Sequence, residues 1–236
     1  MPATIDAATP VGQLVTESPN RARIFEQYGI DYCCGGKLPL TEACQAKGAD
    51  PETVAARIAE LDAAEPPAEA DWTKLSLSEL CDHIVEVHHG YLREELPRIG
   101  AMTEKVASVH GENHPETIAI NNVFKGFVAE IENHAGKEEN ILFPWIKRIE
   151  QGQTAGPFPN DAVGSPIQCM EHEHAEAGEA LAKMNELTDG YNPPMHACNT
   201  WRVLYDALAR LEKDMHIHIH KENNVLFPRT LEAVKT

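Results

Sequence analysis

His134-Ala-Gly-Lys-Glu-Glu-Asn-Ile-Leu-Phe-Pro144 and His218-Ile-His-Lys-Glu-Asn-Asn-Val-Leu-Phe-Pro228 are two copies of one pattern, H-x-x-K-E-x-N-[I/V]-L-F-P, that start 84 positions apart. In a helix, residues i and i+4 lie on one face, so each copy places an imidazole beside a carboxylate. A metal site in the core of a helical bundle is built from such pairs. The two copies therefore predict two half-sites produced by an internal repeat.

A matching helix precedes each copy and adds one more histidine. His89 and His174 both begin the pattern H-x4-E-x-L, 85 positions apart, and the first histidine of the following copy comes 45 and 44 residues later. Each half thus forms a helical hairpin, and two hairpins bring four imidazoles and two carboxylates to one bundle core. The six predicted metal ligands are His89, His134, Glu138, His174, His218 and Glu222.

This ligand set favours a pair of octahedral metal ions. Four imidazoles supply four bonds, and two carboxylates that each bridge both metals supply four more, whereas two octahedral ions need twelve. A bridging oxide or hydroxide would take two of the remaining positions and leave one open on each metal. Imidazole and carboxylate ligands without thiolate favour iron or manganese over structural zinc, which closes tetrahedrally.

The histidines outside the repeat are expected to be surface or hydrogen-bonded core residues. Seven are assigned in this way: His83, His88, His110, His114, His172, His216 and His220. His216 and His220 lie two positions from His218, about 200° around the helix, and should therefore face away from the site. Glu130 and Glu173 each lie beside a ligand histidine, and are either orienting partners of those histidines or surface charges.

Helical patterns account for nearly the whole chain. Residues 1–11 are expected to form a loose tail, and short helices are expected at 18–29, 40–47 and 51–62. The Pro- and Ala-rich stretch 63–70 is predicted to be a linker. It would join a small helical domain, residues 1–65, to a bundle domain, residues 71–236.

Four long helices are expected in the bundle domain. The first opens with the capping box Ser76-Leu-Ser-Glu79 and runs to about 100, where Pro97 ends or kinks it before it resumes at 101–109. Its apolar stripe is expected at Leu80, Ile84, Val87 and Tyr91. The others are expected at 115–149, 165–190 and 197–225, with a loop at 151–164. No strand is expected, so the predicted fold is an all-α, antiparallel four-helix bundle preceded by a small helical domain.

Cysteine chemistry is concentrated in one short turn. Cys33 and Cys34 are followed by two glycines, which predicts an exposed, flexible turn whose thiols can react; the alternative is that they fill a small core. The other four cysteines are expected to be buried apolar side chains: Cys44, Cys81, Cys169 and Cys198.

The composition argues against some kinds of partner. A net charge of −17 over 236 residues argues against nucleic acid and anionic membranes, because both need basic patches. No stretch approaches the roughly 20 apolar residues of a membrane span, and the N-terminus lacks the pattern of a signal peptide. Six cysteines without a secreted-scaffold pattern are expected in a reducing cytoplasm.

With these residues identified, the chain resembles a known family. The bundle resembles hemerythrin-like domains, and the whole chain resembles the iron–sulfur cluster repair di-iron proteins (the RIC, or ScdA/YtfE, type). The N-terminal part matches through Val11-Gly-Gln-Leu-Val-Thr-Glu17 and Asp31-Tyr-Cys-Cys-Gly-Gly36, and the rest through the two H-x3-E…LFP blocks and Glu173-His-Ala-Glu-Ala-Gly178. The ligands of the family fall on the six residues predicted from the repeat.

The resemblance implies a cytoplasmic, non-haem di-iron protein that helps to restore iron–sulfur clusters damaged by nitric oxide or peroxide. Its partners would be damaged iron–sulfur proteins, and its open metal positions would bind nitric oxide or oxygen. Four ligand histidines, against the five of oxygen-carrying hemerythrins, favour redox chemistry or iron release over oxygen carriage. Two alternatives stay open: an enzyme that reduces nitric oxide to nitrous oxide, and a sensing module for these gases. A homodimer through the cysteine domain is also open.

Overall fold

Helices provide the regular structure of this protein. The computed structural model describes residues 5–64, 72–153 and 160–235. Within these ranges there is no strand, and Pro10 and Pro39 form an isolated bridge. The predicted all-α class is confirmed.

The helical elements of the described residues follow one another along the chain. In chain order they are α1 (Val11–Glu17), η1 (Pro19–Arg21), α2 (Ala22–Gln27), α3 (Leu40–Ala46), α4 (Pro51–Ala64), η2 (Trp72–Lys74), α5 (Leu77–Ile84), η3 (Val85–His89), α6 (Gly90–His110), α7 (Pro115–Lys137), η4 (Glu138–Leu142), α8 (Phe143–Glu150), η5 (Asn160–Val163), α9 (Gly164–Leu187), α10 (Asn199–Lys221), η6 (Glu222–Leu226) and α11 (Phe227–Ala233).

Contacts divide the chain into two compact units. One is Cys81–His218, and the other is Met1–Leu80 together with Ile219–Thr236. Most of the predicted linker 63–70 lies outside the described residues, but Ala63 and Ala64 still belong to α4. The linker prediction was wrong at these two alanines, because alanine is the residue that most favours continuing a helix. The proposed domain limits, 1–65 and 71–236, stay predictions.

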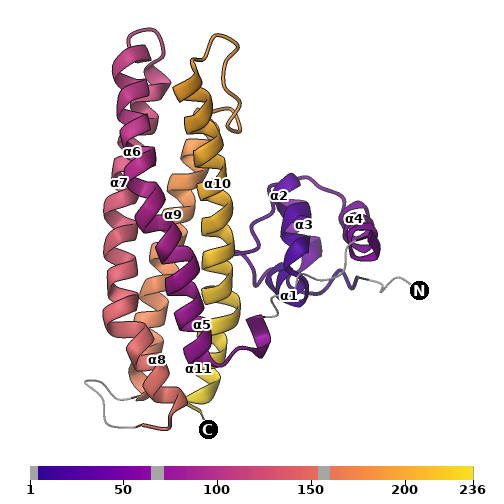
Figure 1. Ribbon diagram of the computed structural model, residues 1–236. Coiled ribbons are helices and arrows are strands. Elements are labelled where there is room, and N and C mark those ends of the chain that lie inside the picture. Colours follow the sequence, from indigo (N-terminus) through magenta and orange to yellow (C-terminus); the bar gives the residue numbers. More distant parts are fainter. Residues whose placement is uncertain (1–4, 65–71, 154–159, 236) are drawn as a thin grey trace. The chain divides into compact units, whose positions relative to one another are not determined.

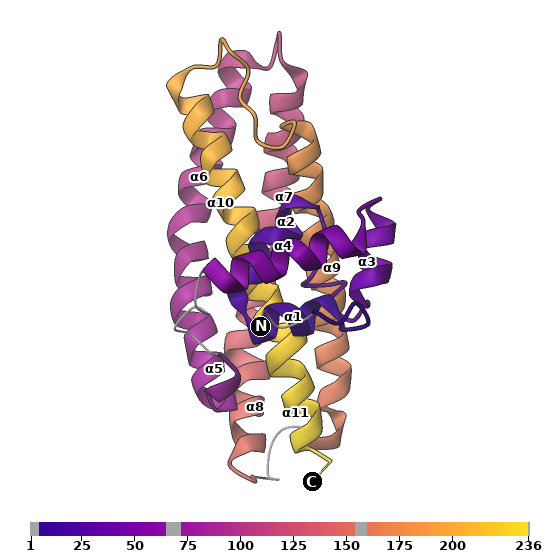
Figure 2. The same ribbon diagram turned by 90° about the vertical axis from the view of Figure 1, so that its right-hand side faces the viewer.

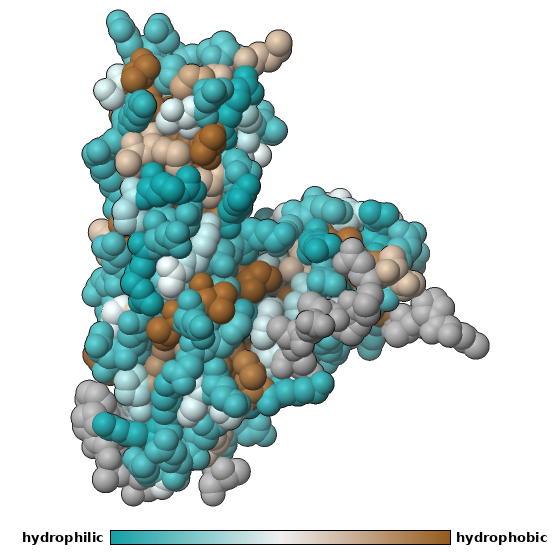
Figure 3. Space-filling view, viewed as in Figure 1, coloured by the Kyte–Doolittle hydropathy of each residue, from teal (hydrophilic) through white to brown (hydrophobic). Residues whose placement is uncertain are grey.

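The long helices α6, α7, α9 and α10 form the bundle, and they lie side by side in Figures 1 and 2. Four residues connect α6 to α7, a length that makes neighbouring helices antiparallel. The buried face of α7 follows a helical period, with Ile120, Phe124, Phe127 and Ile131 at spacings of four, three and four. Burying each such side chain contributes about 1.5–3 kcal/mol. The face of the molecule drawn in Figure 3 is mainly hydrophilic.

Pro97 does not end the first long helix. Helix α6 continues through it to His110, so the prediction of an end there was wrong, whereas the alternative of a kink at Pro97 stays a prediction. An internal proline costs a helix about 3 kcal/mol. Leu92, Leu96 and Ile99 are all buried around it, and their burial offsets that cost. The capping box is confirmed: Glu79 N donates to Ser76 Oγ at 3.1 Å, and Ser76 N donates to Glu79 Oε2 at 2.8 Å.

The first N-terminal helix begins earlier in the chain than predicted. Residues 1–11 were expected to be a tail before the first helix at 18, but α1 begins at Val11, where it buries Val11, Leu14 and Val15. The ends expected for the helices at 18–29 and 40–47 are confirmed, since Gly29 and Gly48 take the left-handed conformation that ends a helix, with φ of 63° and 68°.

Candidate metal centre

Three π-helical segments place predicted ligands in the core. His89 ends η3, Glu138 begins η4 and Glu222 begins η6. In both copies of the repeat, a proline follows two residues after the π segment. Because proline has no N–H to donate, one bond of the α-helical ladder is missing there in any case, and the wider turn is tolerated. Such π segments occur frequently at functional sites.

The carboxylate of Glu138 faces two different imidazoles. Its Oε1 lies 3.4 Å from Nε2 of His134, and its Oε2 lies 3.3 Å from Nε2 of His89. Nε2 of His134 lies in turn 3.0 Å from Nε2 of His174. Glu138 is fully buried, and the three histidines are 1–2% exposed. The carboxylate is therefore oriented to serve two positions at once.

The predicted ligands form two groups that share both carboxylates. In each group one ligand atom from each residue lies within 4.8 Å of all the others. The groups are His89, Glu138, His218 and Glu222, and His134, Glu138, His174 and Glu222. All six residues are buried. Imidazole and carboxylate donors in this number fit iron or another octahedral ion better than structural zinc.

Two further carboxylates form hydrogen bonds with the Nδ1 atoms of ligand imidazoles. Nδ1 of His134 donates to Oε2 of Glu173 at 2.8 Å, and Nδ1 of His89 donates to Oε1 of Glu139 at 2.8 Å. Each bond turns the Nε2 lone pair toward the core, the usual way in which an outer carboxylate fixes a ligand histidine. Partial burial alone would raise the pKa of Glu173, but hydrogen bonds from Lys137 and His134 outweigh it and lower the pKa.

The two glutamates predicted as orienting partners have different positions. Glu173 bonds to His134, whereas Glu130 is exposed on α7. The exposed position of Glu130 fits the second alternative expected for it, a surface charge, and Nδ1 of His134 is already bonded to Glu173. Glu139 was missed, since its bond to His89 spans 50 residues of sequence.

His88 is a hydrogen-bonded core residue, the second of the two alternatives expected for it, but its partner was not predicted. It is 2% exposed, its Nδ1 lies 2.9 Å from Oδ1 of Asp214, and its ring stacks on that of His218 at 5.0 Å and 3°. The π turn of η3 contains one more residue than an α-helical turn, so two consecutive side chains, His88 and His89, both face the core. For the same reason Val87, which was expected in the apolar stripe, is 43% exposed.

The cysteine turn is buried and rigidly held at Cys33. Oδ1 of Asp31 accepts from the backbone N–H groups of Cys33 and Cys34, at 3.0 and 2.9 Å, and Oδ2 accepts from that of Gly35. Cys33 is only 5% exposed, so the prediction of an exposed, flexible turn was wrong there. The hydrogen bond to the Cys34 sulfur, then burial and the Asp31 charge, raise the pKa of the Cys33 thiol.

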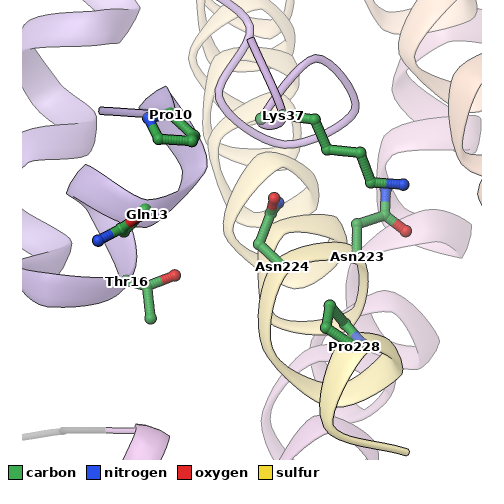
Figure 4. Close-up of a pocket in the computed structure, with 8 residues that line it drawn as sticks. Pro10, Gln13, Thr16, Lys37, Asn223, Asn224 and Pro228 are labelled. Atoms are coloured by element: carbon green, nitrogen blue, oxygen red, sulfur yellow. The ribbon is translucent and has the colours of Figure 1, made fainter. Parts of the chain in front are cut away.

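Residues 220–224 supply partners for the same turn. Nδ2 of Asn224 donates to the carbonyl of Cys33 at 2.9 Å, and Nδ1 of His220 lies 3.4 Å from the carbonyl of Tyr32. His220 thus faces the turn, in agreement with its predicted orientation away from His218, and burial lowers its pKa to about 4. A shallow pocket of about 380 Å³ lies beside these residues (Figure 4), and its lining includes Lys37.

The remaining cysteines fall into two classes. Cys44 and Cys81 are buried, as expected, whereas Cys169 and Cys198 are exposed. The two exposed cysteines were predicted wrongly, because a residue type that is most often buried was placed without regard to the helix face on which it lies.

The fold and its core together define a class of protein: a helical bundle with a cation-binding centre. Residues 81–230 match the hemerythrin HHE cation binding domain, and residues 7–62 match the ScdA_N domain, a domain of unknown function (DUF542). The chain is 39% identical to the iron-sulfur cluster repair protein YtfE of Escherichia coli (strain K12 / DH10B) over 94% of its length and 96% of that protein. The YtfE protein of Shigella boydii serotype 4 (strain Sb227) gives the same identity and coverage. The chain belongs to the YtfE family.

Among the described residues, none of the helices combines the length and the apolar character that a membrane span needs.

Proposed function

We propose that this protein repairs damaged iron–sulfur clusters and that its bundle core holds two iron ions for this purpose. One observation carries the proposal: Glu138 and Glu222 belong to both ligand groups. Two groups that share two carboxylates are what a carboxylate-bridged pair of ions requires. The relatives named above support the function, since each is named an iron-sulfur cluster repair protein.

The chemistry of the donor set supports iron at these positions. Burying a carboxylate costs several kcal/mol unless an opposite charge compensates it, and two cations beside Glu138 and Glu222 would provide that charge. His89 and His218 would hold one ion, and His134 and His174 the other. When bound, the two iron ions would supply the electrons or the iron that rebuilding a cluster needs.

The protein's own groups prepare the site in three ways. Glu139 and Glu173 fix the rotation of their histidines. His88 packs flat against His218 and limits the movement of its ring. Phe143, stacked 6.0 Å from His89, covers the imidazole with an apolar face that excludes water.

The metal centre and the cysteine turn would act on small ligands and on client proteins. Nitric oxide or oxygen would occupy the open positions of the metal pair, and damaged iron–sulfur proteins would be the clients. Cys34, the less buried cysteine of the turn, is the better candidate for thiol chemistry. We further propose a cytoplasmic location, and a homodimer through residues 1–65 as the assembly to test first.

Iron content and repair are the two measurements that test the proposal. We expect about two irons per purified chain, and recovery of activity when the iron-loaded protein is added to a nitric oxide-damaged iron–sulfur enzyme. The Glu138→Ala, Glu222→Ala double variant should lose both the iron and the repair. Glu130→Ala removes an exposed carboxylate from the same bundle and should change neither.

Two results would contradict the proposal. If the double variant kept its iron, the shared carboxylates would not be ligands. The second result concerns a protein with about two irons per chain that restores no activity to the damaged enzyme. If this protein instead formed nitrous oxide over many turnovers, the site would be a nitric oxide reductase centre.

A further inference from the structure

A third group of possible metal ligands lies in the cysteine turn, residues 31–36. Asp31, Cys33 and Cys34 each offer one ligand atom, and these three atoms lie within 4.8 Å of one another. None of the three residues belongs to either buried ligand group. Both cysteines are thiols rather than halves of a disulfide. The turn therefore holds two sulfur donors and one oxygen donor.

The separations between these atoms are close to those of a tetrahedral metal site. Sγ of Cys33 lies 3.8 Å from Sγ of Cys34 and 3.2 Å from Oδ1 of Asp31. A tetrahedral zinc ion has bonds of about 2.3 Å to sulfur and about 2.1 Å to oxygen. It therefore separates two sulfurs by about 3.8 Å, and a sulfur from an oxygen by about 3.6 Å. The sulfurs already have the spacing of ligands, and the carboxylate needs only a small shift.

Hydrogen bonds hold the backbone of the cysteine turn in place. Nδ2 of Asn224 donates to the carbonyl of Cys33 at 2.9 Å, and Figure 4 shows Asn224 directed toward the loop that carries Lys37. Oδ2 of Asp31 accepts the backbone N–H of Gly35 at 2.9 Å, and a carboxylate oxygen has a second lone pair for a metal. Ligands on a backbone that is already ordered lose less conformational entropy when they bind an ion.

The two glycines after Cys34 give the turn the room to close around the carboxylate. A Cβ on Gly35 would lie 3.2 Å from Oδ2 of Asp31, and one on Gly36 would lie 2.6 Å from the carbonyl of Tyr32. Glycine is the residue that permits such a close approach of the backbone. The Cys-Cys-Gly-Gly sequence thus places two thiols and a carboxylate on one tight turn.

One edge of this ligand group is open to solvent. Cys33 is only 5% exposed, but Cys34 is partly exposed and Asp31 is exposed. Structural zinc sites use four protein ligands, whereas a site with three keeps its fourth position for water or another molecule. An ion in the cysteine turn could therefore enter from solvent and accept a ligand from outside the protein.

We propose that Asp31, Cys33 and Cys34 bind one divalent ion of the borderline-soft class, such as zinc or ferrous iron, with the fourth position open to solvent. Each thiol releases its proton to solvent as its sulfur binds, because only the thiolate is a strong ligand. Two thiolates and one carboxylate carry three negative charges, and the ion neutralises two of them. The ion thereby compensates the charge of a Cys33 thiolate, which burial alone disfavours.

Cobalt titration of the iron-loaded, full-length protein tests the proposal. We expect one cobalt ion per chain in addition to the iron of the bundle core, with a thiolate-to-cobalt charge-transfer band in the difference spectrum. Cys34→Ser should bind cobalt at least about 100-fold more weakly, since loss of even an outer partner costs 10- to 100-fold. Cys198→Ser removes an exposed cysteine in another part of the sequence, and this matched control should bind as the wild type does.

Zinc calorimetry in buffers of different ionisation enthalpy provides an independent measurement. The wild type should release about two protons per zinc ion, one from each thiol. Cys34→Ser should keep the iron content and the far-ultraviolet circular dichroism of the wild type, which shows that it folds.

Three results would overturn the proposal. The first is equal cobalt binding by the wild type and Cys34→Ser. The second is a wild-type cobalt spectrum without the thiolate band, or zinc binding without the release of two protons. The third is one ion shared by two chains, seen as metal-dependent dimerisation in size-exclusion chromatography, because the ligand set would then not be complete in one chain.

Discussion

The two ligand groups should respond differently to the loss of shared and unshared ligands. Each group contains four residues, and Glu138 is a member of both, whereas His174 belongs to one. Glu138→Ala therefore removes one ligand from each position, and His174→Ala removes one ligand from a single position. We expect Glu138→Ala to release both metals, and His174→Ala to leave about one per chain.

The magnitude follows from the contacts. Loss of an outer orienting group typically weakens metal binding 10- to 100-fold, and a direct ligand should cost at least the upper end, about 2.8 kcal/mol at 1.4 kcal/mol per tenfold. For Glu138→Ala, this loss of binding free energy is expected at both metal positions. The buried partner Glu222 also loses compensating charge as the metals leave, so the losses should reinforce each other.

Metal content after reconstitution with iron and desalting is the direct assay. Glu130→Ala, an exposed carboxylate on α7, serves as the control and should keep about two irons. The reasoning would be refuted if Glu138→Ala kept one full iron. It would also be refuted if His174→Ala and His218→Ala each released both metals as completely as Glu138→Ala does, because the two positions would then not be separate.

Three further predictions concern single residues. Glu173→Gln should weaken the metal at the His134–His174 position about 10- to 100-fold in a competition titration, and Glu176→Gln, whose ion pair is with exposed His172, should leave it unchanged. Gly36→Ala should lower the free energy of unfolding by about 1–3 kcal/mol in urea, because the added Cβ would lie 2.4 Å from Oδ1 of Asn224 and 2.6 Å from the Tyr32 carbonyl. Gly126→Ala, which meets nothing within 4 Å inside α7, should instead raise it by about 0.5–1 kcal/mol. Iodoacetamide at neutral pH should label Cys34 before Cys33, because burial limits access to Cys33 and its raised pKa keeps the thiol protonated. Mass spectrometry of the labelled protein measures the order. Faster labelling of Cys33 would contradict this account.

The sequence predicted the parts of the site that local spacing determines. His134 and Glu138 lie four residues apart in a helix, and the second copy repeats the pair, so their convergence follows from spacing alone. His89 and His174 followed from the alignment of the two halves. The structure brings all six predicted ligands together.

Residues whose partners are distant in sequence could not be found in this way. The bond between His88 and Asp214 spans 126 residues, and that between His89 and Glu139 spans 50. Neither pair follows a helical period. The exposure of Val87 depends on a π turn, which shifts every later side chain by one position and which an assumed period of 3.6 residues does not reveal.

The cysteine turn shows a second limit of inference from sequence. Two glycines after Cys34 indicate backbone freedom, but Asp31 removes that freedom with three bonds to backbone N–H groups. The burial of Cys33 further depends on Asn224, 191 residues away, which bonds to its carbonyl. Composition alone reports neither effect.

The five residues of η6 limit how this chain can change in evolution or in the laboratory. Glu222, the first of them, belongs to both ligand groups, and Asn224, two positions later, bonds to the carbonyl of Cys33. Inserting or deleting one residue here would turn the following side chains by about 100°. A single change in length would therefore remove a shared ligand or the anchor of the cysteine turn, or both. We expect natural and engineered length variation to be tolerated in the loops and excluded from this segment.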